Sequence, residues 1–277
     1  MIARDFVPPI VVRAAAKLRR PQAAPEIYPT SAAASAACAG HGYEEGALVN
    51  VVFEKTKRLR DRLAARPTPL DLGTTDTRMV LAVRGLAIGD SLTVVDFGGA
   101  CGAHYFTTRA FLPADVSLRW CVVETSAMAG RARELENGEL SFVDGVVDAS
   151  GRVGRPDLVF SSGALQYVDE PYSVLEQLLG LGSASVMFAR LAMSSEPLDL
   201  VTVQRSLLSA HGPGLMPVGF ADGSAMCPLQ IIRRDRLEEI VGRSYEIELR
   251  FAEQEGTQVL AGHRIDQYGY LARARQH

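Results

Sequence analysis

Short apolar runs rich in Val, Leu and Phe follow one another through the middle of the chain, separated by segments long enough for a helix. In order, the runs are "SLTVVDF", "LRWCVVE", "LSFVD", "PDLVFSS" and "SASVMFAR". Strands that are apolar on both faces are typical of a parallel sheet covered by helices, and the alternation of strands with helices indicates βαβ units. We therefore expect a parallel sheet between Leu92 and Arg190.

The end of the chain has a different pattern. The runs "SYEIELRFAEQ" and "DQYGYLARARQ" alternate apolar and polar residues, as strands with one solvated face do. The simplest arrangement places them at an antiparallel edge of the parallel sheet. The predicted fold class is α/β, a Rossmann-like doubly wound, mostly parallel sheet with an antiparallel edge strand.

A helical extension is predicted before the first strand, and a lid-like insertion after the fifth. Apolar residues recur at helical spacing between Tyr43 and Leu63. Residues 21–42 are rich in Pro, Ala, Ser and Gly and indicate a linker or loosely packed loop, and residues 9–20 indicate a short amphipathic helix. The insertion, at about residues 193–228, contains several prolines and glycines, which are typical of lids or binding segments. We therefore predict an N-terminal extension or cap at 1–75 and a main domain at 76–277.

Composition excludes several classes of function. The formal net charge of -3 lacks the strong basic excess of a nucleic-acid-binding domain. No apolar run reaches the roughly 20 residues that a membrane span requires. The four cysteines are widely scattered, without a C-x-x-C spacing, so neither a disulfide framework nor a metal site is expected and a reducing cytoplasm is favoured.

The segment "VVDFGGACGAHYF" carries the first chemical signal. Asp96 lies at the end of the first apolar run, and Gly98, Gly99 and Gly102 follow it. Glycines at this point allow positive φ angles and a close approach of a ligand to the backbone. Because ligands of open α/β sheets bind at the carboxyl ends of the strands, we expect a cofactor here.

Acidic residues also end the next two strands. Glu124 follows "RWCVV", where a carboxylate can accept hydrogen bonds from both hydroxyls of a ribose, and Asp144 follows "LSFV", within reach of an adenine amino group. The fourth strand ends in small residues, in "DLVFSSGALQY", which leave room for a bound group.

Together, D-x-G-G-x-x-G, the two later acidic residues and "DLVFSSGALQY" resemble class I S-adenosylmethionine-dependent methyltransferases over about residues 80–190. "DFVPPI", "DFGGACGAHYF", "LQYV" and "TVQ" further resemble a family of bacterial methyltransferases often encoded with surface-polysaccharide genes. The resemblance implies S-adenosylmethionine as cofactor, S-adenosylhomocysteine as product, no metal, and a small-molecule or sugar-type acceptor. The implied cofactor-binding residues are Asp96, Phe97, Gly98, Gly99, Ala100, Gly102, Glu124, Thr125, Asp144, Gly145, Ser161, Ser162 and Gln166. Ala100 departs from the class pattern, which has glycine at that position.

Two other functions stay open. A NAD-dependent Rossmann oxidoreductase also has a glycine turn before an acidic ribose ligand, although its motif is G-x-G-x-x-G, with the pyrophosphate over the helix N-terminus. A protein that binds the cofactor as a non-catalytic partner is the third reading, since a fold does not establish a function.

Residues that act on the acceptor are harder to assign. His104 and His211 are candidate general bases because an imidazole titrates near neutral pH, and Tyr167 is a third catalytic candidate. Tyr105, Arg190 and Gln204 are candidate substrate-binding residues. Each has a plainer structural role as its alternative: a helix cap, a solvated side chain or simple packing.

Charge is unevenly distributed along the chain. Residues 1–66 carry 11 Lys and Arg against 6 Asp and Glu. On a helix, Lys55, Arg58 and Arg62 fall near one face. A cationic wall of this kind favours phosphate or carboxylate, so we predict an anionic acceptor such as a nucleotide-linked sugar, with a solvated helix face as the alternative.

Overall fold

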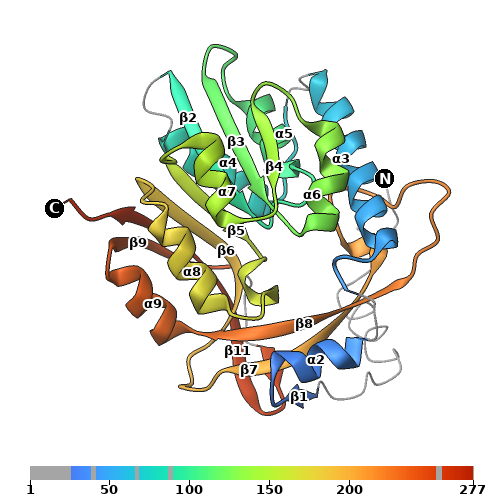
Figure 1. Cartoon of the computed structure of the whole chain (residues 1–277), viewed down its shortest axis with the longest axis vertical. Helices are drawn as coiled ribbons and strands as arrows, with labels where there is room; N and C mark the ends of the chain where they lie inside the picture. The colour runs from blue at the N-terminus through green and yellow to red at the C-terminus, as the bar shows by residue number, and fades with distance from the viewer. Residues whose placement is uncertain (1–25, 39–41, 66–68, 87–89, 254–257, 277) are drawn as a thin grey trace.

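Five parallel strands form the centre of the fold, in the order β4-β3-β2-β5-β6 (Figure 1). The computed structural model describes residues 26–38, 42–65, 69–86, 90–253 and 258–276. The five strands are β2 (Ser91–Phe97), β3 (Ser117–Val123), β4 (Leu140–Val143), β5 (Leu158–Ser162) and β6 (Ser185–Ser194). Each corresponds to one of the five apolar runs, and their residues are almost entirely buried.

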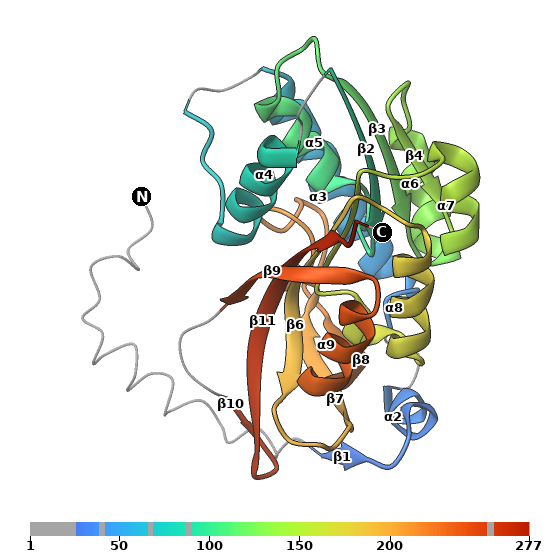
Figure 2. The ribbon, with the colours of Figure 1, turned by 90° about the vertical axis from the view of Figure 1, so that its left-hand side faces the viewer.

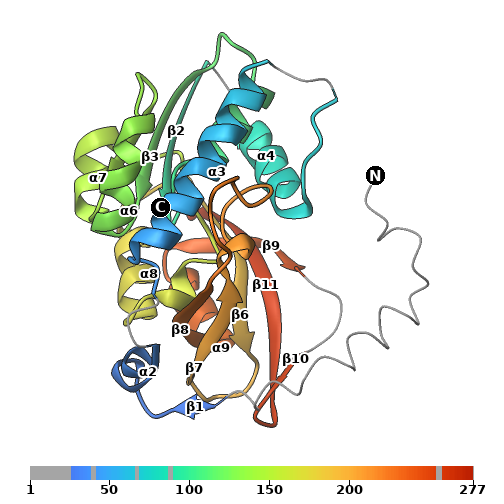
Figure 3. The ribbon, with the colours of Figure 1, turned by 90° about the vertical axis from the view of Figure 1, so that its right-hand side faces the viewer.

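Helices cover both faces of this sheet (Figures 2 and 3). On one face lie α3 (Gly46–Ala64), α4 (Thr74–Leu86), α5 (Ala103–Phe111) and α6 (Ser126–Ala132), and on the other lie α7 (Val146–Val153), α8 (Pro171–Gly180) and α9 (Arg234–Gly242). Successive strand residues point to opposite faces. Val94 therefore packs in the core below the first group of helices and Val95 in the core below the second.

The C-terminal strands complete the sheet as predicted. β11 (His263–Ala274) runs antiparallel to β6, and β9 (Tyr245–Ala252) runs antiparallel to β11. β9 is therefore parallel to the central strands, and β11 lies between β6 and β9. The predicted fold class, a doubly wound and mostly parallel sheet with antiparallel strands at one edge, is confirmed.

The region predicted as a lid-like insertion contains two strands that belong to the sheet. β7 (Leu200–Leu207) and β8 (Ser224–Arg233) form an antiparallel pair, and the end of β8 pairs in parallel with the end of β6. Only residues 208–223 connect the two strands without further strand structure, beginning with the short helix η4 (Leu208–Ala210). Alternation of apolar and polar residues in "LVTVQRSL" was the overlooked strand signal.

The prediction of a loose linker at 21–42 is also wrong in part. The strand β1 (Ile27–Tyr28) pairs with β7, and α2 (Ser31–Cys38) packs against β7 and β8. Ala34 and Cys38 are the buried residues of α2, so small side chains form a close-packed helix here. The helix predicted at residues 9–20 lies outside the described residues.

The predicted boundary between residues 75 and 76 falls inside α4. Residues of α3 and α4 pack in the same hydrophobic core as β2 and β3. The division into a cap and a main domain stays a prediction.

One feature of the topology positions the site. The strand that follows β2 in the chain, β3, lies on one side of it, whereas β5 lies on the other. The connections from β2 and β5 thus leave the sheet in opposite directions and open a crevice at the carboxyl ends of these strands.

Candidate functional site

A cavity of about 1150 Å³ lies at the carboxyl ends of the central strands. Thirteen of the predicted site residues line it: Phe97, Gly98, Ala100, Glu124, Thr125, Asp144, Gly145, Ser162, Gln166, Tyr167, Arg190, Gln204 and His211. Six do not: Asp96, Gly99, Gly102, His104, Tyr105 and Ser161. The cavity also reaches Leu229 and Ile231 of β8 and Leu260 of β10 (Gln258–Leu260), a short strand paired with β11.

The glycine turn after β2 is shaped by contacts within the protein. Gly98 has a φ of +71°, and a Cβ at this position would lie 2.0 Å from the Cβ of Ala164. A Cβ on Gly99 would lie 2.3 Å from a carboxylate oxygen of Asp96. Both positions therefore require glycine because of neighbouring protein atoms, whatever ligand lies above them.

Ala100 occupies the left-handed region with a φ of +51°. This conformation disfavours residues with a Cβ, and it explains why the class pattern has glycine here. The departure noted in the sequence is therefore a strained residue within an otherwise conventional turn.

Asp96 lies below the turn and not in the cavity. Its side chain is fully buried and accepts a hydrogen bond of 3.1 Å from Nε1 of Trp120, and Nδ1 of His104 lies 3.1 Å from the same oxygen. We predicted direct contact of Asp96 with the cofactor, but in the described geometry it braces the turn from the core side.

Glu124 lies on the cavity side of the same turn. Its Oε1 accepts a hydrogen bond of 3.0 Å from the backbone N–H of Ala100, and its Oε2 accepts one of 2.9 Å from that of Thr125. Burial raises the pKa of this carboxyl to about 7, against the two backbone hydrogen bonds, which lower it. An ionised carboxylate has about four acceptor sites, so two remain for a ligand.

The ends of β3 and β4 face the same part of the cavity. Thr125 caps α6 through a 3.4 Å hydrogen bond from the backbone N–H of Met128. Asp144 is exposed and accepts a hydrogen bond of 2.9 Å from the Ser126 hydroxyl, and Gly145 is the N-cap of α7. These polar groups lie beside Glu124 at the mouth of the crevice.

Arg190 closes the cavity near the end of β5. It occupies the left-handed region with a φ of +54°, where the pairing of β6 with β11 shifts register. Its guanidinium donates hydrogen bonds of 2.9 Å to the hydroxyl and to the carbonyl oxygen of Ser162. A Cβ on Gly163 would lie 3.2 Å from this guanidinium, so the turn after β5 and the arginine fit closely together. Ser161 is fully buried, and its hydroxyl has no hydrogen-bond partner among the described residues.

The far side of the cavity has a separate polar cluster. Tyr167 donates a hydrogen bond to Oε1 of Gln204, and its ring lies edge-on to that of Tyr43 at 5.1 Å between centroids. Burial raises the pKa of both tyrosines, so both stay protonated at neutral pH and act as hydrogen-bond donors rather than bases. His211 shares a 2.7 Å hydrogen bond with the Ser206 hydroxyl through Nε2.

The two candidate bases differ in environment. Burial alone would lower the pKa of His104, but the Asp96 carboxylate outweighs it and raises the pKa. His104 is thus paired with Asp96 below the turn, with Nδ1 3.1 Å from the carboxylate. Burial and then the Lys55 ammonium lower the pKa of His211, which keeps its imidazole neutral beside the cavity. Of the two candidates, only His211 lines the cavity, and the assignment of a base stays a prediction.

Tyr105 lies in the core and not beside an acceptor. Its side chain packs edge-on against Trp120, and its hydroxyl donates a 2.8 Å hydrogen bond to Glu139. This placement argues against the predicted substrate contact and matches the plainer alternative of packing.

The predicted cationic wall is wrong. Lys55 is buried, whereas Arg58 and Arg62 are exposed, and none of the three lines the cavity. They do not share one environment because Lys55 faces the segment after β7, while the two arginines point to solvent. Charge on α3 therefore no longer favours an anionic acceptor.

Sequence reasoning missed Tyr43 and Ser206. Tyr43 lies three residues before the start of α3, and Ser206 lies in β7, in the region predicted to be a lid-like insertion. Recognition of β7 as a strand would have placed Ser206 and Gln204 on one face of it, since residues two apart share a face.

Two further findings limit the chemistry. Within the described ranges, no group of three or more His, Cys, Asp or Glu side chains could hold a metal ion. In the same part of the chain, no helix has the length and apolar character needed to cross a membrane.

No protein-family model and no curated protein matches the sequence. Similar solved structures include the N-terminal domain of EvdMO1 in the presence of SAH and D-fucose, with 16% identity, a TM-score of 0.45, and coverage of 79% of this chain and 97% of that one. The amino pentose methyltransferase CalS10 from Micromonospora echinaspora, bound to SAM, is 14% identical, with a TM-score of 0.49 and coverage of 81% of this chain and 97% of that one. The [4+2]-cyclase SpnF is 13% identical, with a TM-score of 0.49 and coverage of 92% of this chain and 100% of that one. With TM-scores below 0.5, these likenesses carry no argument about function.

Proposed function

We propose that this protein transfers a methyl group from S-adenosylmethionine to a hydroxyl of a small molecule or sugar. The observation that carries the proposal is the Glu124 carboxylate. It directly follows β3, the strand next to β2, is fixed by two backbone N–H groups, and lines a cavity of about 1150 Å³. Its two remaining acceptor sites match the two hydroxyls of a ribose.

The residues around Glu124 fit the rest of the cofactor. Asp144 and Gly145 would lie at the adenine, and Gly98, Ala100 and Ser162 would border the methionine portion. Bound there, the cofactor supplies an activated methyl group on a sulfonium, whose C–S bond breaks as the acceptor forms its new bond. The protein contributes by aligning the acceptor and excluding water, and such positioning can supply much of the rate.

The backbone of the turn disfavours the dehydrogenase alternative. A dinucleotide pyrophosphate needs free N–H groups at the glycine turn and the helix N-terminus. Here the N–H of Gly98 binds the carbonyl oxygen of Val123 at 2.9 Å, that of Gly102 binds Gly99 at 2.9 Å, and that of Ala100 binds Glu124. These donors are already paired within the protein, which suits an uncharged ribose better than a diphosphate.

The acceptor side of the cavity suits a neutral hydroxyl compound. Leu229, Ile231 and Leu260 provide apolar contact, and Tyr167 and His211 provide polar groups nearby. Apolar walls with a few polar groups are typical of small-molecule sites. The sugar-type acceptor is implied by the sequence resemblance and remains part of the proposal.

Isothermal titration calorimetry tests the proposal first. S-adenosylhomocysteine and S-adenosylmethionine should each bind one site per chain, and NAD should give no saturable heat. Binding of NAD without a response to either sulfur compound would replace the proposal with the oxidoreductase alternative. A screen of hydroxyl compounds with a methyl-labelled donor then separates an enzyme from a non-catalytic binding protein.

A further inference from the structure

Lys55 is a charged side chain enclosed within the molecule. It is only 1% exposed, although it belongs to the helix with the most basic surface in the N-terminal part of the chain. Its ammonium group donates hydrogen bonds to two backbone carbonyl oxygens, 2.8 Å to Ser209 and 2.6 Å to His211. Burial of an ammonium group is costly unless it is well hydrogen-bonded, so these two bonds determine where the side chain lies.

Both acceptors belong to the segment that follows β7. Beside them, Gly212 has a φ of +69°, and a Cβ there would lie 3.3 Å from the Cα of Val52 on α3. The segment therefore packs directly against the helix at Gly212 and is held by Lys55 on either side of Ala210. His211 therefore lies between the Ser209 carbonyl, which Lys55 holds, and Gly212, which packs on α3.

This attachment fixes the imidazole of His211 in the cavity wall. Nε2 shares its hydrogen bond with Ser206, and the ring lies edge-on to that of Tyr43, with 5.4 Å between centroids and an interplanar angle of 85°. If Nε2 carries the proton and donates to Ser206, the lone pair of Nδ1 is free to accept one.

The groups facing this imidazole favour its neutral form. Ser206 and Tyr43 are uncharged, and the Lys55 ammonium lies 2.6 Å from the backbone carbonyl oxygen of His211. The Asp222 carboxylate accepts hydrogen bonds of 3.0 Å and 2.6 Å from the backbone N–H and the hydroxyl of Ser209. A cation close to the ring disfavours an imidazolium. The carboxylate of Asp222 is bonded to Ser209 and so does little to stabilise one.

We propose that Lys55 is a positioning residue that holds His211 through its backbone carbonyl, so that the imidazole takes the proton of the acceptor hydroxyl. The proposal rests on the proposed function, because it needs an acceptor that loses a proton. In that step the acceptor O–H bond breaks and its proton moves to Nδ1 of His211. The electron pair of the oxygen forms the bond to the methyl group as the methyl–sulfur bond breaks, and the electron pair of that broken bond stays on the sulfur of the product. The positive charge thus passes from the sulfonium to the imidazolium of His211, so charge and atoms balance.

Nuclear magnetic resonance of the histidine rings tests this without an acceptor. Ring-labelled protein, with His211→Gln to assign the signal, is titrated with acid in the presence of S-adenosylhomocysteine. In the unmodified protein, His211 should have its proton on Nε2 and titrate below the ordinary histidine range. Lys55→Met should move the titration to higher pH and speed amide hydrogen exchange at residues 208–212.

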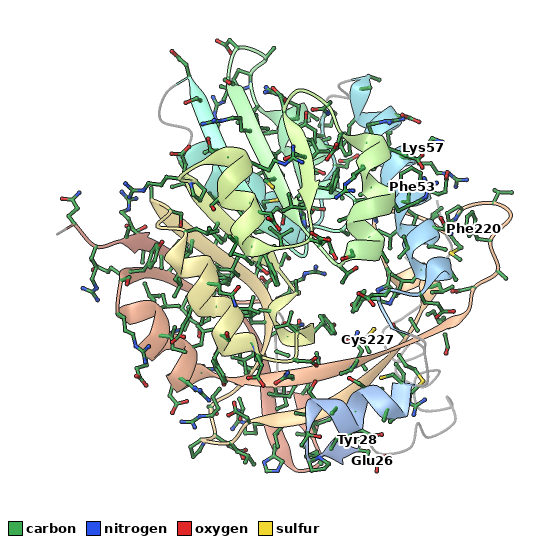
Figure 4. The ribbon with its side chains drawn as sticks, in the orientation of Figure 1. Glu26, Tyr28, Phe53, Lys57, Phe220 and Cys227 are labelled. Atoms are coloured by element: carbon green, nitrogen blue, oxygen red, sulfur yellow. The ribbon has the colours of Figure 1, made fainter. Side chains whose placement is uncertain are left out.

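Two variants provide the comparison. Lys57→Met removes the same charge from the exposed side of α3, where Figure 4 labels Lys57, and should leave the His211 titration unchanged. Lys55→Arg keeps a cationic donor and should restore much of the unmodified titration. With a known acceptor, Lys55→Met should lower kcat by about 100-fold, the size expected for a misplaced group, without changing KM for the donor.

Three results would overturn the proposal: a proton on Nδ1 in the unmodified protein, titration at or above the ordinary range, or a folded Lys55→Met protein identical to Lys57→Met. The first two need no Lys55 variant, so they decide the matter even if Lys55→Met does not fold. Absence of S-adenosylhomocysteine binding in calorimetry would instead refute the proposed function, and the ring titration would still report on the role of Lys55.

Discussion

Replacement of Glu124 should weaken binding of S-adenosylhomocysteine strongly while the protein stays folded. Glu124→Ala removes the two acceptor sites left free after the backbone bonds from Ala100 and Thr125. Hydrogen bonds to a charged group contribute about 1.5 to 3 kcal/mol each, but ribose hydroxyls regain water when the carboxylate is absent. We therefore expect a loss of about 2 to 3 kcal/mol in total, or roughly 30- to 150-fold in Kd.

The same carboxyl should make binding depend on pH. Because burial raises the pKa of Glu124 to about 7, most of the ligand-free protein is protonated there at pH 6 and ionised at pH 8. The ionised form accepts both ribose hydroxyls, so affinity should fall as pH falls, by up to about tenfold between pH 8 and pH 6. Binding at pH 7 should release about half a proton per site, because about half of the ligand-free carboxyl groups are protonated there.

Calorimetry at pH 6 and pH 8, in buffers of different ionisation enthalpy, measures both effects. Glu124→Ala and Glu124→Gln should lose the pH dependence. Glu176→Gln, which removes a charge from the exposed side of α8, should retain it. If a folded Glu124→Ala protein binds S-adenosylhomocysteine as the unmodified protein does, with the same pH dependence, then the ribose lies elsewhere and the reasoning fails.

Four further variants test other parts of the structure. Ala100→Gly should raise the free energy of unfolding by up to about 1 kcal/mol in urea, since relief of the left-handed conformation outweighs the added freedom of glycine in the unfolded chain; a loss of stability would contradict the strain. Arg58→Glu with Arg62→Glu should leave kcat and the KM for the acceptor unchanged at low and high salt, once an acceptor is known, whereas a large, salt-dependent rise of that KM would support the predicted cationic wall. Tyr105→Phe should cost about 1 kcal/mol of stability and leave product affinity intact, and a selective loss of affinity would return this residue to the site. Because the Asp96 carboxylate raises the pKa of His104 in the folded protein, this pair stabilises the protein at pH values below the pKa of the unfolded chain, and the stabilisation is lost as pH rises through the folded pKa. His104→Gln should therefore lower the free energy of unfolding more at pH 6 than at pH 9. An equal loss at both pH values would show that the pair is uncharged.

The central sheet could be predicted because its strands are buried on both faces. Runs such as "TVVDF" and "DLVFSS" have no polar alternation, so they differ sharply from the helices between them. Because Glu124 and Asp144 each follow a parallel strand, the sequence also predicted that both lie at the carboxyl edge of the sheet, and both line the cavity.

The acceptor side could not be predicted in the same way, because long-range contacts determine it. Lys55 had the same helical spacing as Arg58 and Arg62, and only the packing of the segment after β7 buries it. Asp96 illustrates the opposite case. Its position near the end of β2 was predicted correctly, but its side chain lies in the core, bonded to Trp120 and His104.

The most direct test of the central claim is a crystal structure of the protein with S-adenosylhomocysteine. The account predicts the adenosine in the crevice beside β2 and β3, with both ribose hydroxyls within about 3.2 Å of the Glu124 carboxylate oxygens and the sulfur directed toward the side of the cavity that contains His211. The product bound at any other site, or a ribose held by a residue other than Glu124 in this crevice, would contradict the account.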